Sequence, residues 1–259
     1  MLAAVRNGDA KTLAELMRQD PGFNVNKQDG SGVTLLHEAC QGRHGSAMVP
    51  LLLAHPDIDV NVEDKNGETP FYFACYGYPS CVREMLKDSR VKVNEPANDG
   101  YTPLGYAAYQ GSLDIIKWWI ASGREMDLGK PGEWTTDAIG RAKKNGKTEM
   151  ATLLERFKSD ATQTRHAMRV ELGWYDLAAA EMFALVVFVS DGLLQVKNTT
   201  ISTPGARLFS IAAQLPLELQ MVMCYRFVRS SREIISGKES EAAFKELAES
   251  LLWSSFFAN

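Results

Sequence analysis

The sequence lacks any long run of apolar residues. Its longest apolar stretch, Met182 to Val189, is bounded by Glu181 and by Ser190. A membrane-spanning helix needs about 20 such residues, so we interpret this stretch as the core of a buried helix. Residues 1–6 also lack the apolar segment that a secretory signal carries. We therefore expect no secretion and no membrane partner.

The sequence also has no large excess of positive or negative charge. The 259 residues contain 28 Lys and Arg against 32 Asp and Glu, which gives a formal net charge of −4. The small acidic excess is shared between the two parts of the chain, so neither end forms a basic tail or an acidic arm. The basic run from Arg141 to Lys147 is weak evidence for nucleic-acid binding in an acidic protein. We expect no nucleic-acid partner.

Cysteine and histidine are scarce, with four of each. No two cysteines form a CxxC pair, and no histidine stands at metal-ligand spacing from a cysteine or another histidine. We expect no metal, no cofactor and no disulfide framework. A reducing compartment is the simplest account of such cysteine usage, so we expect a cytoplasmic location, with the nucleus as an alternative.

Sequence motifs of catalysis are not found. Gly237-Lys238-Glu239 lacks the upstream Gly and the Ser or Thr of a phosphate-binding loop, and no strand precedes Ser190-Asp191-Gly192 to make a nucleophile elbow. We predict a protein that is not an enzyme and that uses no small-molecule substrate. One enzyme hypothesis stays open, in which the catalytic groups lie in the C-terminal part of the chain.

What the sequence does contain is an internal repeat. Its threonines, Thr34, Thr69 and Thr102, stand 35 and 33 residues apart. Such a period is typical of stacked helical repeats, in which each unit buries its apolar face only against its neighbours. The three matching segments are Asp29 to Cys40, Asp64 to Cys75 and Ala97 to Ala108.

Each repeated position has a physical reason. A glycine two residues before the threonine permits the positive φ of a tight hairpin turn. The threonine hydroxyl accepts from unpaired backbone donors at a helix N-terminus, and a proline after it gives up a donor that would be unpaired. Paired small residues let helices approach closely. Cys40 and Cys75 occupy one such position, so we interpret them as core residues rather than metal ligands or nucleophiles.

The pattern D-x-x-G-x-T-P-L-H-x-A-A, a glycine turn, a second apolar helix and a Val-Asn ending together resemble the ankyrin-repeat family. The resemblance covers residues 1–158. It implies an all-α fold, an α-solenoid with short β-hairpin loops, built from a truncated N-terminal cap unit and about four repeats. In the last repeat Asp137 and Ala138 replace Thr and Pro. The Val-Asn ending occurs at residues 25–26, 60–61 and 93–94.

The resemblance also implies a concave protein-binding surface formed by hairpin tips and inner helices. Tyr and Trp are enriched at interface hot spots because they bury a large rigid surface. The alternative is that the exposed aromatic side chains of the repeats are ordinary surface residues without a partner, and that Tyr72 and Phe73 only pack between helices. The residues at the family's contact positions that we predict to bind a protein partner of unknown identity are Lys65, Asn66, Tyr76, Tyr101, Tyr109 and Trp134.

Two repeats depart from the family pattern. In ankyrin repeats a histidine three residues after the threonine commonly hydrogen-bonds the adjacent hairpin. Here only His37 retains it, whereas Tyr72 and Gly105 occupy the equivalent positions. We therefore expect lower local stability between the third and fourth units.

The period ends near Lys158, so residues 159–259 form a second predicted domain, a helical module packed on or after the last repeat. We expect residues 159–165 to be a polar linker, followed by about four helices. Apolar residues at helical spacing occur in 177–189, 217–227 and 244–252. The module resembles the C-terminal extensions of fungal ankyrin-repeat proteins.

A short motif in this module resembles the opening of an F-box, which docks the scaffold of a cullin-type ubiquitin ligase. Ankyrin repeats joined to an F-box-like C-terminus occur in poxviral host-range proteins. The alternative interpretation is a helix N-terminus with a proline in its first turn. We thus predict an interaction scaffold, and keep a substrate-recruiting ubiquitin-ligase adaptor and an enzyme as alternatives. The residues that match the motif are Leu215, Pro216, Glu218, Leu219 and Met223.

Overall fold

The computed structural model describes residues 1–20, 22–190, 215–228 and 240–248, and these residues form helices and turns without a strand. The predicted all-α repeat stack is confirmed. Contacts divide the chain into a first unit, residues 1–168, and a second unit, residues 169–252. The division falls ten residues after Lys158, where the period ends.

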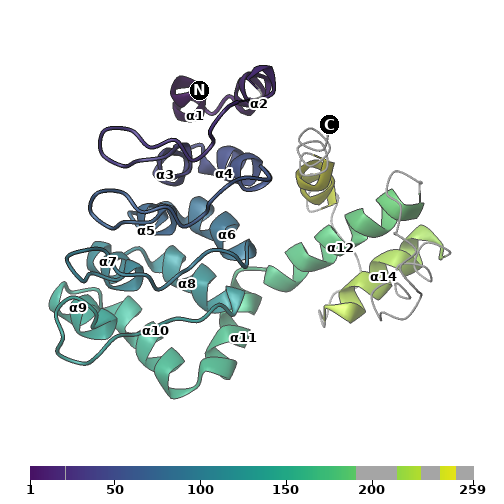
Figure 1. Ribbon diagram of the computed structural model, residues 1–259. Helices are drawn as coiled ribbons and strands as arrows, with labels where there is room; N and C mark the ends of the chain where they lie inside the picture. The colour runs from purple at the N-terminus through teal and green to yellow at the C-terminus, as the bar shows by residue number, and fades with distance from the viewer. Residues whose placement is uncertain (21, 191–214, 229–239, 249–259) are drawn as a thin grey trace, which may run out of the picture. The chain divides into compact units, whose positions relative to one another are not determined.

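The first unit is a stack of helix pairs. The first helices of the pairs lie in one column and the second helices in another, which Figure 1 shows for α1 to α10. We call α1, α3, α5, α7 and α9 the inner helices and their partners the outer helices. Their bounds are α1 (Leu2–Asn7), α2 (Ala10–Gln19), α3 (Leu35–Cys40), α4 (Gly45–Leu53), α5 (Pro70–Ala74), α6 (Pro79–Lys87), α7 (Pro103–Gln110), α8 (Leu113–Ser122), α9 (Ala138–Lys144) and α10 (Thr148–Ser159).

The predicted caps begin the inner helices. The Thr69 hydroxyl accepts from the backbone N–H of Tyr72 at 3.2 Å, and the Thr102 hydroxyl accepts from that of Gly105 at 3.1 Å. In the last repeat the carboxylate of Asp137 replaces the hydroxyl and accepts from the N–H of Gly140 at 2.8 Å. The repeat with the most divergent sequence therefore starts its helix by the same chemistry.

The hairpin loops hydrogen-bond one another along the stack. The backbone N–H of Lys65 donates to the carbonyl of Ser31, and that of Asn98 donates to the carbonyl of Asn66. Gly67 has a φ of 75°, and a Cβ there would lie 2.9 Å from the Asn98 nitrogen. The positive φ of the turn and the close approach of the next hairpin both require glycine at this position.

The asparagine of each Val-Asn ending fixes the following loop. The Asn61 side chain donates to the carbonyl of Arg90 at 2.9 Å and accepts from the N–H of Lys92 at 2.8 Å. Asn26 makes the same pair of bonds with Asp57 and Asp59. One amide side chain thus satisfies two backbone groups of the next repeat.

Packing replaces the missing histidine at the two divergent repeats. His37 makes the expected bond, since its Nε2 lies 3.0 Å from the Glu68 carbonyl oxygen. Tyr72 is buried, and its ring centroid lies 5.6 Å from that of Tyr106 in the next repeat. At Gly105 a Cβ would lie 2.9 Å from the carbonyl oxygen of Thr135. The next hairpin therefore occupies the space that a side chain would need.

The second unit contains the end of α11 (Ala161–Glu171), then α12 (Trp174–Ser190), α14 (Leu217–Phe227) and the helical residues 240–248. The predicted polar linker at 159–165 is wrong, because α11 begins there and buries Thr164. The predicted helix at 244–252 is described only as far as residue 248. The Gly237-Lys238-Glu239 segment, which was compared with a phosphate-binding loop, lies outside the described residues.

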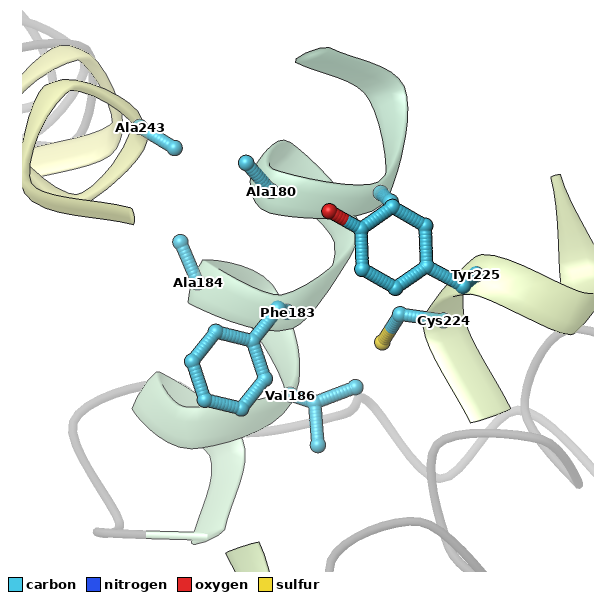
Figure 2. Packing of buried hydrophobic residues seen from close by; sticks show 8 residues of the cluster. Ala180, Phe183, Ala184, Val186, Cys224, Tyr225 and Ala243 are labelled. Carbon is cyan, nitrogen blue, oxygen red and sulfur yellow. The ribbon is translucent and has the colours of Figure 1, made fainter. Parts of the chain in front are cut away.

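The core of the second unit forms on α12. Small residues let the other segments approach this helix closely, and Figure 2 shows Ala180 and Ala184 opposite Ala243. Cys224 and Tyr225 of α14 are fully buried in the same cluster. The interpretation of Met182 to Val189 as part of a buried helix agrees with this packing.

No single helix in the described part of the chain is long and apolar enough to cross a membrane. One pair bent by 67°, Ala161–Glu171 with Trp174–Val189, passes the same length and composition test when taken together.

Candidate functional site

The repeat period places two rows of side chains on the inner helices of the first unit and in the turns that directly follow them. One row holds the residue after the histidine position, and the other holds the residue three positions later. We call these eight residues the inner-helix surface. The first row is Glu38, Phe73, Tyr106 and Arg141, and the second row is Gln41, Tyr76, Tyr109 and Lys144.

Aromatic rings form the middle of the inner-helix surface. Tyr76 stacks on Phe73 with ring centroids 5.3 Å apart, and its ring lies 4.7 Å from Tyr106 in the next repeat. Tyr106 in turn lies 6.3 Å from Tyr109 on the same helix. Tyr109 is 47% exposed. The rings therefore form a continuous strip across α5, the turn that follows it and α7, and the end of the strip is open to solvent.

The strip ends at Arg141 of α9. The guanidinium carbon lies 4.2 Å from the ring centroid of Tyr101, 4.9 Å from Trp134 and 5.6 Å from Tyr109. The indole N–H of Trp134 donates to the Tyr101 hydroxyl oxygen at 2.7 Å. Lys144 places its ammonium 4.1 Å from the Trp134 ring. Cation–π attraction thus holds three predicted contact residues around one arginine.

The two ends of the inner-helix surface differ in charge. At the N-terminal end Glu38 pairs with Arg6, with an Nη2 to Oε1 distance of 2.9 Å. At the other end no carboxylate in the described part of the chain pairs with Arg141, which is only 4% exposed. In the last repeat the surface therefore has an exposed cation, Lys144, and a buried one, Arg141, beside aromatic rings.

Glu68 of the second hairpin lies beside the strip. Burial raises the pKa of this carboxyl above its ordinary value, against the opposing effect of a hydrogen bond with Tyr76. The pKa of the Tyr76 phenol is also raised, mainly by burial and by the same hydrogen bond. Tyr76 is thus half-buried and joined to the hairpin.

The structure brings only some of the predicted contact residues together. Tyr101, Tyr109 and Trp134 surround Arg141, and Tyr106 connects them to Tyr76. Lys65 and Asn66 lie exposed at a hairpin tip, and the Asn66 side chain is bound to its own Asp64. Sequence reasoning missed Tyr106 and Arg141. Aligning the residue after the histidine position in every repeat would have found both.

The buried thiols are part of the core. Cys40 and Cys75 are fully buried at equivalent positions, as the interpretation of core residues requires, and burial raises the pKa of both. Cys81 lies nearby with a pKa raised to about 11, also mainly by burial. A thiol that stays protonated is a poor nucleophile and a poor metal ligand. In the described part of the chain no group of His, Cys, Asp and Glu is arranged to hold a metal ion.

A cavity of about 610 Å³ lies at the other end of the first unit, between the cap unit and the first hairpin. Its lining includes Phe23, Lys27, Asp29 and Glu38. Of these, only Glu38 belongs to the inner-helix surface, and it is engaged by Arg6.

The repeat geometry agrees with a comparison against family models. The model described as ankyrin repeats (3 copies) matches residues 1–97 and 44–129. The N-terminal half of this chain belongs to the ankyrin-repeat family. Ankyrin repeats are in general protein–protein interaction modules, and the family is typically non-enzymatic. No curated protein gives a significant match to the chain. Arg141 and Trp134 lie beyond the residues that the ankyrin model matches.

The motif that resembles an F-box lies at the start of α14, in the second unit. Pro216 is the N-cap residue of this helix. Leu217 and Leu219 are each 52% exposed, whereas Leu215 and Met223 are half-buried. The Glu218 side chain lies outside the described residues. The helix therefore begins at Leu217, one residue after the proline that the alternative interpretation places in its first turn, and it presents two leucines to solvent.

Proposed function

We propose that this chain is a non-enzymatic scaffold that binds a partner protein on the inner-helix surface of its ankyrin repeats. The observation that carries the proposal is the continuous strip of rings that ends at Tyr109 and Trp134. Both residues are nearly half exposed, at 47% and 44%. Large, rigid and partly exposed aromatic side chains are the residues most enriched at interface hot spots.

A substitution at Tyr109 tests the proposal. The ring is 47% exposed and has contacts with Tyr106 and Arg141, so Tyr109→Ala is expected to lower the melting temperature only slightly. It is expected to weaken partner binding by about 2 kcal/mol if the ring is a hot spot. The bait proteins are the wild-type chain, Tyr109→Ala and the control Trp118→Ala, which removes a half-buried aromatic ring from the outer helix α8.

Proteins captured by the wild type and by Trp118→Ala, and lost with Tyr109→Ala, are then purified and titrated by calorimetry. If every purified partner binds folded Tyr109→Ala as tightly as the wild type, the inner-helix surface is not the binding site.

A ubiquitin-ligase adaptor is the second candidate. The exposed Leu217 and Leu219 at the start of α14 favour it, because exposed apolar side chains on a helix are available for docking. Leu219→Asp is expected to abolish capture of a cullin scaffold component, and Tyr109→Ala is expected to leave that capture intact. Absence of any such component from the wild-type capture would end the adaptor hypothesis.

We further propose a location in the cytoplasm or nucleus. The four cysteines are free and buried, which suits a compartment that keeps thiols reduced. Fluorescence microscopy of a tagged full-length chain checks this proposal, and signal confined to a secretory compartment would contradict it.

A further inference from the structure

Arg141 is a buried cation with two hydrogen-bond donor nitrogens that have no partner. The residue is 4% exposed, and its Nε and Nη1 atoms have no hydrogen-bond partner. Burial of a charged group without hydrogen bonds is costly. The surrounding rings offset part of this cost through cation–π attraction, but a ring face is not a hydrogen-bond acceptor of ordinary strength.

The site that holds this guanidinium is built by neighbouring repeats. Gly105 has no side chain, and Nη1 of Arg141 lies 3.6 Å from the position that a Cβ would take there. Tyr101 and Trp134 approach from two hairpin loops and are bound to each other. Asp137 caps the helix that carries the arginine. The guanidinium is therefore positioned by packing before any partner arrives.

We propose that Arg141 receives a carboxylate from an acidic side chain of the partner protein, which makes the inner-helix surface selective for segments with Asp or Glu beside apolar residues. A guanidinium N–H donates a charge-assisted hydrogen bond to a carboxylate oxygen. Nε and Nη1 lie on different edges of the guanidinium, and each is a donor that a carboxylate oxygen can satisfy. The inference rests on the proposed function, because it names the chemistry of the partner at the same surface.

Trp134 controls access to the arginine. Both unpaired nitrogens are out of contact with solvent, so a ring must move to admit a carboxylate. Trp134 is the ring suited to this movement, because it lies on the loop between α8 and α9 and is 44% exposed. Its movement breaks the hydrogen bond to the Tyr101 hydroxyl. Its departure also frees the ammonium of Lys144 to approach the incoming charge.

The aromatic strip beside Arg141 favours a peptide over a free anion as the ligand of this site. Phosphate also accepts hydrogen bonds from a guanidinium. A peptide, however, also covers Tyr109 and Tyr106, which lie next to Arg141 on the inner-helix surface. An acidic peptide therefore uses contacts that inorganic phosphate leaves empty.

Selection from a phage-displayed library of random peptides on the full-length chain tests the inference. We expect enriched peptides to carry Asp or Glu beside apolar residues. Synthetic versions are expected to lose at least about tenfold in affinity, or about 1.4 kcal/mol, when the acid is replaced by its amide or when the protein carries Arg141→Met. Inorganic phosphate at the same concentration is expected to compete poorly.

The matched control is Lys143→Gln. It removes one positive charge from the same helix, but Lys143 pairs with Glu155 of α10 and not with the aromatic residues. Peptide affinity is expected to change little in this variant. An equal loss in Lys143→Gln and Arg141→Met would show a general charge effect and would overturn the inference.

Stability separates a binding role of Arg141 from a purely structural one. Because methionine fills similar space without an unpaired charge, Arg141→Met is expected to melt at the wild-type temperature or above it. In protein labelled with fluorinated tryptophan, the Trp134 resonance, assigned with Trp134→Phe, is expected to shift when the acidic peptide is added. A lower melting temperature with unchanged peptide affinity would assign Arg141 to the fold alone.

Failure of the inference and failure of the proposed function give different results. Peptides that need Tyr109 but carry no acid, or that bind Arg141→Met unchanged, overturn the carboxylate inference and leave the scaffold proposal standing. Binding of inorganic phosphate that depends on Arg141, without binding of acidic peptides, also overturns it. Peptides that bind Tyr109→Ala as tightly as the wild type count against both. If Arg141→Met does not fold, the acid-to-amide change in the peptide still decides the inference.

Discussion

His37 shows how single residues support this fold. Its Nδ1 accepts from the backbone N–H of Thr34 at 3.1 Å, and its Nε2 lies 3.0 Å from the carbonyl oxygen of Glu68 in the next hairpin. Together these contacts require a neutral ring with its proton on Nε2. A second proton would occupy Nδ1 and break the bond to Thr34. Burial accordingly lowers the pKa of His37 below its ordinary value of 6.5.

The first prediction concerns this histidine and pH. Because folding lowers its pKa, the stabilisation from His37 is complete above about pH 6.5 and decreases as the pH falls below that value. His37→Ala is expected to lower the free energy of unfolding by about 3 kcal/mol at neutral pH. It is also expected to remove this pH dependence. Urea unfolding at several pH values measures both effects, with the exposed His166→Ala as the control.

The second prediction concerns Glu68, whose pKa folding raises. A group of this kind stabilises the protein most below its unfolded pKa, and that stabilisation is lost as the pH rises through the folded pKa. Glu68→Gln is therefore expected to melt at or above the wild-type temperature at pH 7, and to gain less on acidification. Thermal melts of Glu68→Gln at pH 7 and at acidic pH measure both effects. Glu63→Gln, which changes an exposed carboxyl, is the control. A large loss of stability at pH 7 would contradict the argument.

At the scale of elements, loops are joined by side chains that belong to other repeats. The Val-Asn ending is visible in the sequence, but its function is not, because the backbone groups that it binds lie about 30 residues later. The caps were predictable for the opposite reason. Thr69 and Asp137 bind donors three residues away, so their role follows from local sequence.

The third prediction tests the asparagine connection. Asn61→Ala leaves one carbonyl and one N–H of the next loop without their partner, so the free energy of unfolding is expected to fall by about 2 kcal/mol. Lys92→Ala is the matched control, because it removes an exposed side chain and keeps the backbone N–H that Asn61 binds. Equal losses in the two variants, measured by urea unfolding, would show that the asparagine has no special role.

At the scale of the whole molecule, the sequence period and the contacts within the structure place the end of the first unit at different residues. The period ends near Lys158, but α11 continues from Ala161 and buries Thr164 and Met168. The first unit accordingly extends to Met168. A helix that packs against a repeat stack does not need to repeat its sequence, so periodicity alone underestimates the length of the unit.

The fourth prediction compares two fragments. In a repeat stack each unit is stabilised by its neighbour, and the end needs a cap. The fragment 1–168 is expected to unfold cooperatively and to melt at a higher temperature than the fragment 1–158. The physical reason is the burial of Thr164 and Met168 in the longer fragment. Thermal unfolding followed by circular dichroism measures the difference, and equal melting temperatures would refute a stabilising role for α11.

The sequence by itself determined the repeats, their caps, their glycine turns and the row positions of the aromatic residues, because these depend on neighbours within one helical turn or on a fixed period. Only the tertiary structure decided the environment of Arg141. Its burial depends on the missing side chain of Gly105 and on an irregular loop that lays Trp134 beside it. Contacts of this kind join residues from different repeats, so no local pattern in the sequence predicts them.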